Sequence, residues 1–216
     1  MICKTCLNTH THPYGINFDK SGVCSGCITA KEHSRFEPNN MFLLIKEIKK
    51  NGKNQDYDCI VPIRGDADDY FVVNTLLEYE IRPLLVGVNS FFLNDIGWKN
   101  IQKLQTSFDL DTIFYNPNLS IYKNLVSYSL AKFGDVNLPF QYIFHTYVKI
   151  MAIAKNIKYI IYGENQPIEQ TGNFSNFDYP EKSLWFHTVF DFRNKQLKEF
   201  MGTGAGYNLN DLFFYN

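Results

Sequence analysis

The chain has 216 residues, of which 45% are hydrophobic and 20% are charged, so it suits one ordinary packed domain with a small appendage. The formal net charge of −1 argues against a general nucleic-acid binder, because such a protein needs a basic field to neutralise phosphates. No apolar run reaches the length of a membrane span, and the first residues lack the apolar core of a signal peptide. We therefore expect a cytoplasmic protein, in which paired cysteines bind metal rather than form disulfides.

Two Cys-x-x-Cys pairs lie near the N-terminus, with 17 residues between them. This spacing is typical of a zinc ribbon, in which two knuckles bring four thiolates to one tetrahedral ion. Gly22 and Gly26 supply the backbone freedom that a knuckle requires, and so short a segment must draw much of its folding energy from the metal. A redox role for either pair is the alternative. Residues 1–36 form the predicted ribbon, and its predicted metal ligands are Cys3, Cys6, Cys24 and Cys27.

Strand and helix patterns alternate after the ribbon. The predicted strands are 58–63, 83–88, 112–115 and 159–162, and the predicted helices are 39–51, 70–79, 97–108, 120–133 and 139–156. The alternation predicts right-handed crossovers and a mostly parallel sheet in a three-layer α/β/α domain. Ligands in such sheets bind beyond the carboxyl ends of the strands, which here are 64–69, Asn89, Asn116 and 163–165. The fifth cysteine, Cys59, falls in the first strand and is predicted to be a buried core residue.

Four segments of the sequence match one family in the same order. They are the opening Cys-Lys-Thr-Cys, the later Gly-Val-Cys-Ser-Gly-Cys, the strand Asp-Cys-Ile-Val-Pro-Ile, and Tyr-Gly-Glu-Asn-Gln at the end of the fourth strand. From Cys3 to about Gly172 the chain resembles the N-acetyl sugar amidotransferases, which belong to the PP-loop ATP pyrophosphatases. The resemblance implies that the ribbon precedes a PP-loop, nucleotide α-hydrolase-like domain over 37–172. Because members of the family continue further, we expect residues 173–216, an aromatic-rich extension, to be a naturally short or truncated C-terminus.

The resemblance also implies an activity, which is ATP-dependent amidation of the N-acetyl group of an activated sugar for lipopolysaccharide or flagellin. ATP would activate the acetamido carbonyl oxygen as an adenylate and release pyrophosphate, and ammonia would then displace AMP to leave an acetamidino group. The implied cofactors are a structural zinc, ATP and magnesium. The implied partners are the activated sugar and ammonia-supplying subunits similar to the glutaminase and cyclase of imidazole glycerol phosphate synthase.

The loop after the first strand departs from the family's Ser-Gly-Gly-x-Asp-Ser, whose amides hold pyrophosphate and whose acid helps to hold magnesium. Gly65 and Asp68 keep their family positions. Arg64, Asp66 and Asp69 replace the first serine, the second glycine and the last serine. The three carboxylates repel phosphates unless a cation bridges them, whereas Arg64 suits phosphate oxygens, and Asp69 also suits a helix start as a cap or dipole partner. The loop therefore leaves two outcomes open, altered nucleotide binding or loss of ATP chemistry.

Polar residues at the strand ends complete the predicted crevice. The predicted catalytic residues are Asp68 and Glu164. The predicted cofactor-binding residues are Arg64, Gly65, Asp66, Asp69, Asn89, Gly163 and Asn165, and the predicted substrate-binding residues are His145, Gln166 and Glu169. Structural alternatives stand beside these roles, since an Asn-stabilised turn explains 163–165 and a satisfied core residue explains His145.

Three functions follow from these features. The first is a sugar amidotransferase-like enzyme. The second is a non-catalytic relative that keeps the ribbon and the fold as a binding or scaffold subunit, and the altered loop favours this second function. The third is a tRNA-modifying PP-loop protein, against which the lack of basic charge weighs. The extension beyond residue 172 has three open roles: covering the crevice, joining subunits into a homo-oligomer, or belonging to a missing C-terminal part.

Overall fold

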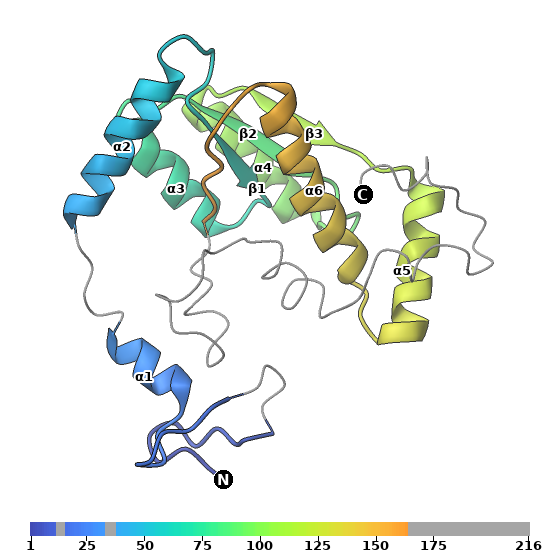
Figure 1. Ribbon diagram of the computed structural model, residues 1–216. Coiled ribbons are helices and arrows are strands. Elements are labelled where there is room, and N and C mark those ends of the chain that lie inside the picture. The colour runs from blue at the N-terminus through green and yellow to red at the C-terminus, as the bar shows by residue number, and fades with distance from the viewer. Residues whose placement is uncertain (12–15, 33–37, 164–216) are drawn as a thin grey trace. The chain divides into compact units, whose positions relative to one another are not determined.

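The computed structural model of the chain describes residues 1–11, 16–32 and 38–163 (Figure 1). These residues fall into two compact units, the first reaching Phe42 and the second running from Leu43 to Gly163. Within the described ranges, no helix combines the length and the apolar character that a membrane span requires. The predicted extension at 173–216 lies outside the described residues.

The first unit is a small cysteine-centred fold. Its two hairpin-like turns are each held by one antiparallel bridge, Ile2 with Thr9 and Phe18 with Cys24, and helix α1 (Ser25–Glu32) follows the second turn. Gly22 has a φ of +83°, so it supplies the left-handed turn that the sequence predicts. Gly26 lies inside α1, where no such freedom is needed, and the loop role predicted for it is wrong.

The chain from α2 onward alternates helices with strands, as predicted. The elements are α2 (Pro38–Gly52), β1 (Cys59–Ile63), α3 (Ala67–Glu78), β2 (Pro83–Val88), α4 (Asp95–Phe108), β3 (Thr112–Tyr115), α5 (Leu119–Phe133) and α6 (Leu138–Ala154). The three strands form a parallel sheet in the order β1-β2-β3, with Ile60 opposite Leu84 and Val86 opposite Ile113. Cys59 is fully buried in β1, which confirms its predicted place in the core.

The predicted fourth strand, 159–162, is present only as a single parallel bridge beside β1. The N–H of Ile60 donates to the Tyr159 carbonyl (2.9 Å), and the N–H of Ile161 donates to the Ile60 carbonyl (2.8 Å). In a parallel ladder the next bond on this side would come from residue 62 of β1. That residue is Pro62, which has no N–H to donate, so the pairing stops after one bridge.

Helices cover both faces of the sheet. Phe114 of β3 packs on Trp98 of α4, with ring centroids 5.3 Å apart, and the adjacent Tyr115 stacks on Tyr147 of α6 at 4.8 Å. Successive residues of a strand point to opposite faces, so α4 and α6 lie on opposite sides of the sheet (Figure 1). The three-layer α/β/α arrangement predicted from the sequence is confirmed.

The core explains why the strands read as unbroken apolar runs. Every residue of β1 and β2 is buried, which is expected for a parallel sheet covered on both faces. On the α6 side one cluster joins the sheet, the helix and the segment after it, and its buried members are Ile60, Leu84, Val86, Val148, Ala152 and Ile157. Burial of this apolar surface holds β1 at the centre of the unit, and β1 in turn positions the loop that follows it.

Candidate functional site

Within the described part of the sheet, the strand order reverses at one position. From β1 the chain passes to β2 and then to β3, and it later returns to lie on the other side of β1 through the bridge at Ile160. Ligands of open parallel sheets bind outside the carboxyl ends of the strands at such a reversal. The residues placed there are the loop 64–69 after β1 and Gly163 after the bridged segment.

Gly65 fixes the path of the loop. Its φ is +87°, which disfavours residues with a side chain, and a Cβ there would lie 2.8 Å from Cγ1 of Ile101 and 3.1 Å from the carbonyl of Gly97. The side-chain amide of Asn100 donates to the Gly65 carbonyl at 3.2 Å. The loop is therefore held closely against α4, and glycine is required at position 65 by both conformation and space.

Asp69 lies beneath this loop and accepts its backbone hydrogen bonds. One carboxylate oxygen, Oδ2, accepts the N–H of Arg64 at 2.7 Å, of Gly65 at 2.6 Å and of Asp66 at 3.3 Å. The residue is only 4% exposed. Burial, together with the charge of Asp66, raises the pKa of Asp69 to about 6, although the three N–H groups act in the opposite direction.

The two outer acids of the loop form the helix cap. Asp66 is the N-cap residue of α3 and accepts the N–H of Asp69 at 3.1 Å, while Asp69 closes the reciprocal half of a capping box. A structural role for Asp69 at the helix start is thus confirmed, although the cap itself is Asp66. Asp68 also lies in the first turn of α3, and the residue is exposed.

Gly163, the last described residue of the second predicted motif, lies at the same place. A Cβ on Gly163 would lie 3.1 Å from the Cβ of Asp68 and 3.2 Å from its carbonyl carbon and oxygen. The end of the bridged segment therefore rests on the first turn of α3. The loop and Gly163, which are about a hundred residues apart in the chain, share one site.

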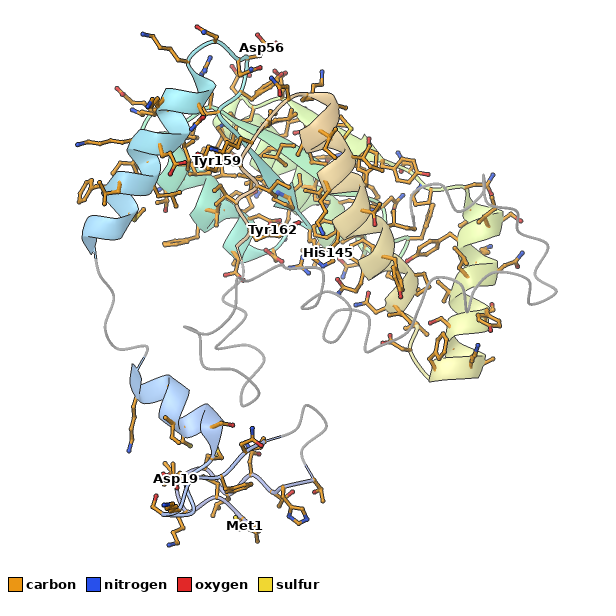
Figure 2. The ribbon with its side chains drawn as sticks, in the orientation of Figure 1. Met1, Asp19, Asp56, His145, Tyr159 and Tyr162 are labelled. Carbon is orange, nitrogen blue, oxygen red and sulfur yellow. The ribbon has the colours of Figure 1, made fainter. Side chains whose placement is uncertain are left out.

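A series of ring contacts runs from Arg64 of the loop through α6 to Tyr162. The Arg64 guanidinium lies over the ring of Phe144 at 5.4 Å, an arrangement typical of a cation–π contact. Phe144 contacts His145 at 5.5 Å, and His145 contacts Tyr162 at 5.8 Å, with both labelled side chains close together in Figure 2. His145 is 3% exposed, so it is a core residue at the edge of the crevice, and its substrate role stays a prediction.

Asn89 joins the ends of two strands. Its side-chain amide donates to the side chain of Asn116 at 2.9 Å, and its side-chain oxygen accepts the N–H of Phe91 at 2.8 Å. These two hydrogen bonds connect the buried side chain of Asn89 to the segments that follow β2 and β3, so Asn89 has a structural role at the carboxyl ends of these strands. Its predicted contact with a cofactor stays a prediction.

Four predicted site residues lie outside the described residues. They are Glu164, Asn165, Gln166 and Glu169. The catalytic role of Glu164, the cofactor role of Asn165 and the substrate roles of the other two therefore stay predictions from the sequence. The described part of the candidate site consists of the loop 64–69, Gly163 and the ring contacts that end at Tyr162.

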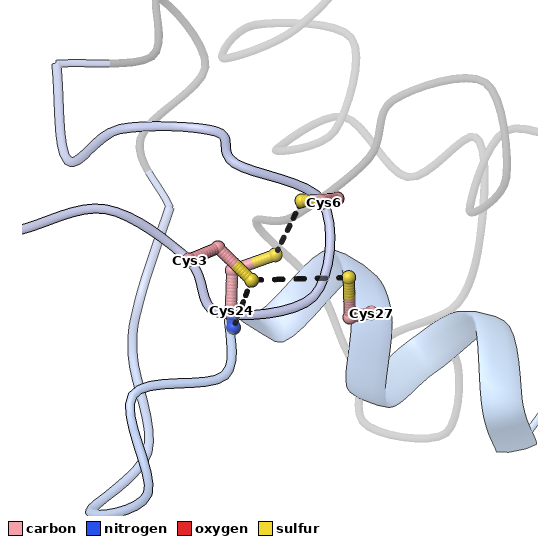
Figure 3. A group of neighbouring side chains, drawn as sticks. All are labelled: Cys3, Cys6, Cys24 and Cys27. Carbon is pink, nitrogen blue, oxygen red and sulfur yellow. Dashed lines mark hydrogen bonds between the residues drawn. The ribbon is translucent and has the colours of Figure 1, made fainter.

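The first unit contains a separate candidate site, the cluster of four cysteine sulfurs in Figure 3. All four sulfurs lie within 4.8 Å of one another. Cys3 and Cys27 are 3.9 Å apart through their sulfurs, and Cys6 and Cys24 are 3.5 Å apart. Tetrahedral zinc with Zn–S bonds of about 2.3 Å separates its sulfurs by roughly 3.8 Å, so the donor set fits such an ion.

The thiols of Cys3 and Cys27 have pKa values that are shifted in opposite directions. Burial raises the pKa of the Cys27 thiol to about 12, and the neighbouring thiols add to the effect. Burial acts in the same direction on Cys3, but N–H groups of the backbone outweigh it and lower the pKa of that thiol to about 6. Two of those N–H groups, from Thr5 and Cys24, lie 3.4 and 3.3 Å from the Cys3 sulfur. Backbone N–H groups that point at a sulfur favour its thiolate, which is the form that binds metal.

The bonds of Asp69 and the contact of Arg64 with Phe144 are the functional features that sequence reasoning missed. The sequence did contain a signal for the hydrogen bonds of Asp69, because an acid three residues after the N-cap residue Asp66 fits the capping-box pattern. It did not show that the same carboxylate also reaches back to two earlier amides. The ring contact had no signal, because Arg64 and Phe144 are joined only by the packing of α6 on the sheet.

No protein-family model matches the chain. An uncharacterised protein of Methanocaldococcus jannaschii is 25% identical over 121 residues, which are 54% of this chain and 43% of that protein, so the chain spans less than half of its relative.

Solved structures also align with part of the chain. An NMN synthetase of Francisella tularensis aligns with a TM-score of 0.46 and 9% identity, over 61% of this chain and 56% of that one. An NH3-dependent NAD synthetase of Campylobacter jejuni aligns with a TM-score of 0.45 and 13% identity, over 77% of each chain. Scores and identities this low do not assign an activity. The class established by the structure is thus a three-layer α/β protein with a parallel sheet and an N-terminal four-cysteine cluster.

Proposed function

We propose that the chain is an amidotransferase-like protein that acts on the N-acetyl group of an activated sugar in bacterial surface-glycan synthesis. The observation that supports it best is the meeting of the Gly65 loop and Gly163 where the strand order reverses. The loop after β1 and the described end of the Tyr-Gly-Glu-Asn-Gln segment, which the resemblance assigns to one site, thus lie side by side. The whole reaction, its sugar and its ammonia-supplying partners belong to this proposal.

Within this proposal, each described residue has a distinct task. Asp68 is the exposed acid at the crevice, suited to hold a cation or to contact the substrate. Arg64, positioned over Phe144, is suited to an anionic group of the activated sugar. The four cysteines would hold a structural zinc, which supplies folding energy to the small first unit rather than chemistry.

ATP fits the loop less well than the resemblance implies. The amides expected to hold pyrophosphate, those of residues 64 to 66, already donate to Asp69. We therefore assign no step of the reaction to ATP held at this loop. The same observation favours a second candidate, a non-catalytic relative that keeps the crevice for binding or for scaffolding a partner subunit.

Isothermal titration of the zinc-loaded chain with an acetamido sugar nucleotide is the first test. The enzyme proposal expects saturable binding that Asp68→Asn weakens about tenfold, as the loss of a charged contact costs roughly 1.4 kcal/mol or more. Incubation with an acetamido sugar nucleotide, ammonia, ATP and magnesium should then give the acetamidino product, with AMP and pyrophosphate released, read as a mass change of the sugar. An absence of binding and of product would refute the enzyme proposal and leave the second candidate.

A further inference from the structure

The amides of the loop point at one place. Three successive N–H groups, from residues 64 to 66, converge on a single oxygen at the N-terminus of α3, at distances of 2.6 to 3.3 Å. Converging backbone N–H groups at a helix start form a concavity that favours an anionic oxygen. In this protein the oxygen belongs to the chain itself, because it is Oδ2 of Asp69.

The carboxylate is held there by burial as well as by its bonds. Asp69 is 4% exposed, and the structure shows no ion pair for it among the described residues. Its negative charge is therefore balanced by the loop amides and the start of α3. Any anionic group of a ligand would have to displace a carboxylate that is tethered to the site and carries the same charge.

We propose that Asp69 is an internal competitor that takes the place of a ligand phosphate and blocks the loop amides. It acts as an autoinhibitory contact and sets specificity, because it excludes phosphate from the amides of residues 64 to 66. The proposal concerns the crevice of the proposed function, but it does not depend on amidation. It explains how this chain keeps Gly65 and the turn while holding an acid where the resembling family has serine.

The test uses the full zinc-loaded chain and inorganic pyrophosphate in isothermal titration at pH 7.5. Asp69→Ser removes the carboxylate and opens the amides, so we expect pyrophosphate to bind at least tenfold more tightly than to the unaltered chain. Asp95→Ser is the matched control, because Asp95 is an exposed acid in the first turn of α4 and its loss removes the same charge without freeing these amides. We expect the control to bind within twofold of the unaltered chain.

Asp69→Asn guards against a folding failure of the serine variant, because it keeps the shape and an accepting oxygen but removes the charge. We expect a smaller gain in affinity, about threefold. Amide resonances of residues 64 to 66 should shift with pyrophosphate most in the serine variant and less in the asparagine variant. Equal affinity in the unaltered chain and both Asp69 variants, or an equal gain in Asp95→Ser, overturns the proposal. A gain specific to Asp69 without any acetamidino product would instead uphold it and reject the enzyme function.

Discussion

Gly163 rests on the backbone of Asp68, so that a Cβ at position 163 would lie 3.1 Å from the Cβ of Asp68. This contact ties the end of the segment beside β1 to the first turn of α3. The atoms opposite Gly163 include the carbonyl carbon and oxygen of Asp68, which belong to a helix and cannot move as a flexible side chain would. The contact therefore makes the geometry of the crevice sensitive to a single methyl group.

Gly163→Ala should lower the free energy of unfolding by about 1 kcal/mol, at the low end of the cost of overfilling a packed site. The methyl group must push the first turn of α3 away. Urea denaturation measures the change, and amide resonances of α3 should shift with it. A variant as stable as the parent would mean that the entropy gained by replacing glycine outweighs the crowding, and the proposed rigidity of this contact would be wrong.

Gly65→Ala should be markedly worse, with a loss of about 2–4 kcal/mol. Two costs combine, because the backbone has a φ of +87° and the new Cβ would lie 2.8 Å from Ile101. Gly134→Ala provides the matched control, since Gly134 has a φ of +70° but meets no atom within 4 Å. We expect that control to lose only about 1 kcal/mol in urea denaturation. Similar losses in the two variants would show that packing against α4 contributes nothing.

The stability of the second unit should depend on pH through Asp69. Its pKa in the folded chain is raised to about 6 from the ordinary 3.8, chiefly by burial, so the folded state binds the proton more tightly than the unfolded state. The resulting stabilisation is fully present below about pH 4 and is lost as the pH rises through 6. By linkage it amounts to about 3 kcal/mol.

Comparison with Asp69→Asn isolates this contribution, because the variant cannot titrate at position 69 while other groups, including the cysteines, titrate alike. Urea denaturation of both proteins between pH 4 and pH 8 gives the measurement. The unaltered chain should gain stability relative to Asp69→Asn as the pH falls from 7 to 4. Parallel profiles would contradict the raised pKa.

The purified chain should contain one zinc ion per molecule, and a chelator that removes it should unfold the first unit. Elemental analysis by mass spectrometry gives the stoichiometry, and circular dichroism follows the loss of structure. Cys27→Ala should lose most of the metal, because three sulfurs hold zinc less tightly than four. Cys59→Ala is the control, since this cysteine is buried in β1 and, among the residues that the structure describes, belongs to no group of metal-ligand side chains. Metal loss in both variants would argue against the four-cysteine site.

The local patterns of the sequence were sufficient to predict the order of the helices and strands and the clustering of the four cysteines. Cysteine pairs and alternating apolar runs act over a few residues, so their spacing carries the information. The short pairing at Ile160 also has a local cause in Pro62, although the prediction of a full strand overlooked it.

What only the tertiary structure decided is the state of the crevice. The sequence places three acids after β1, and their types alone do not tell which one caps the helix, which faces solvent and which turns inward. Packing of the Gly65 turn against α4 brings three amides to one point, and Asp69 is the acid that reaches it from the first turn of α3. The contact of Gly163 with Asp68 likewise depends on where the chain returns beside β1. Such placements arise from contacts between residues far apart in the chain, which spacing and composition do not encode.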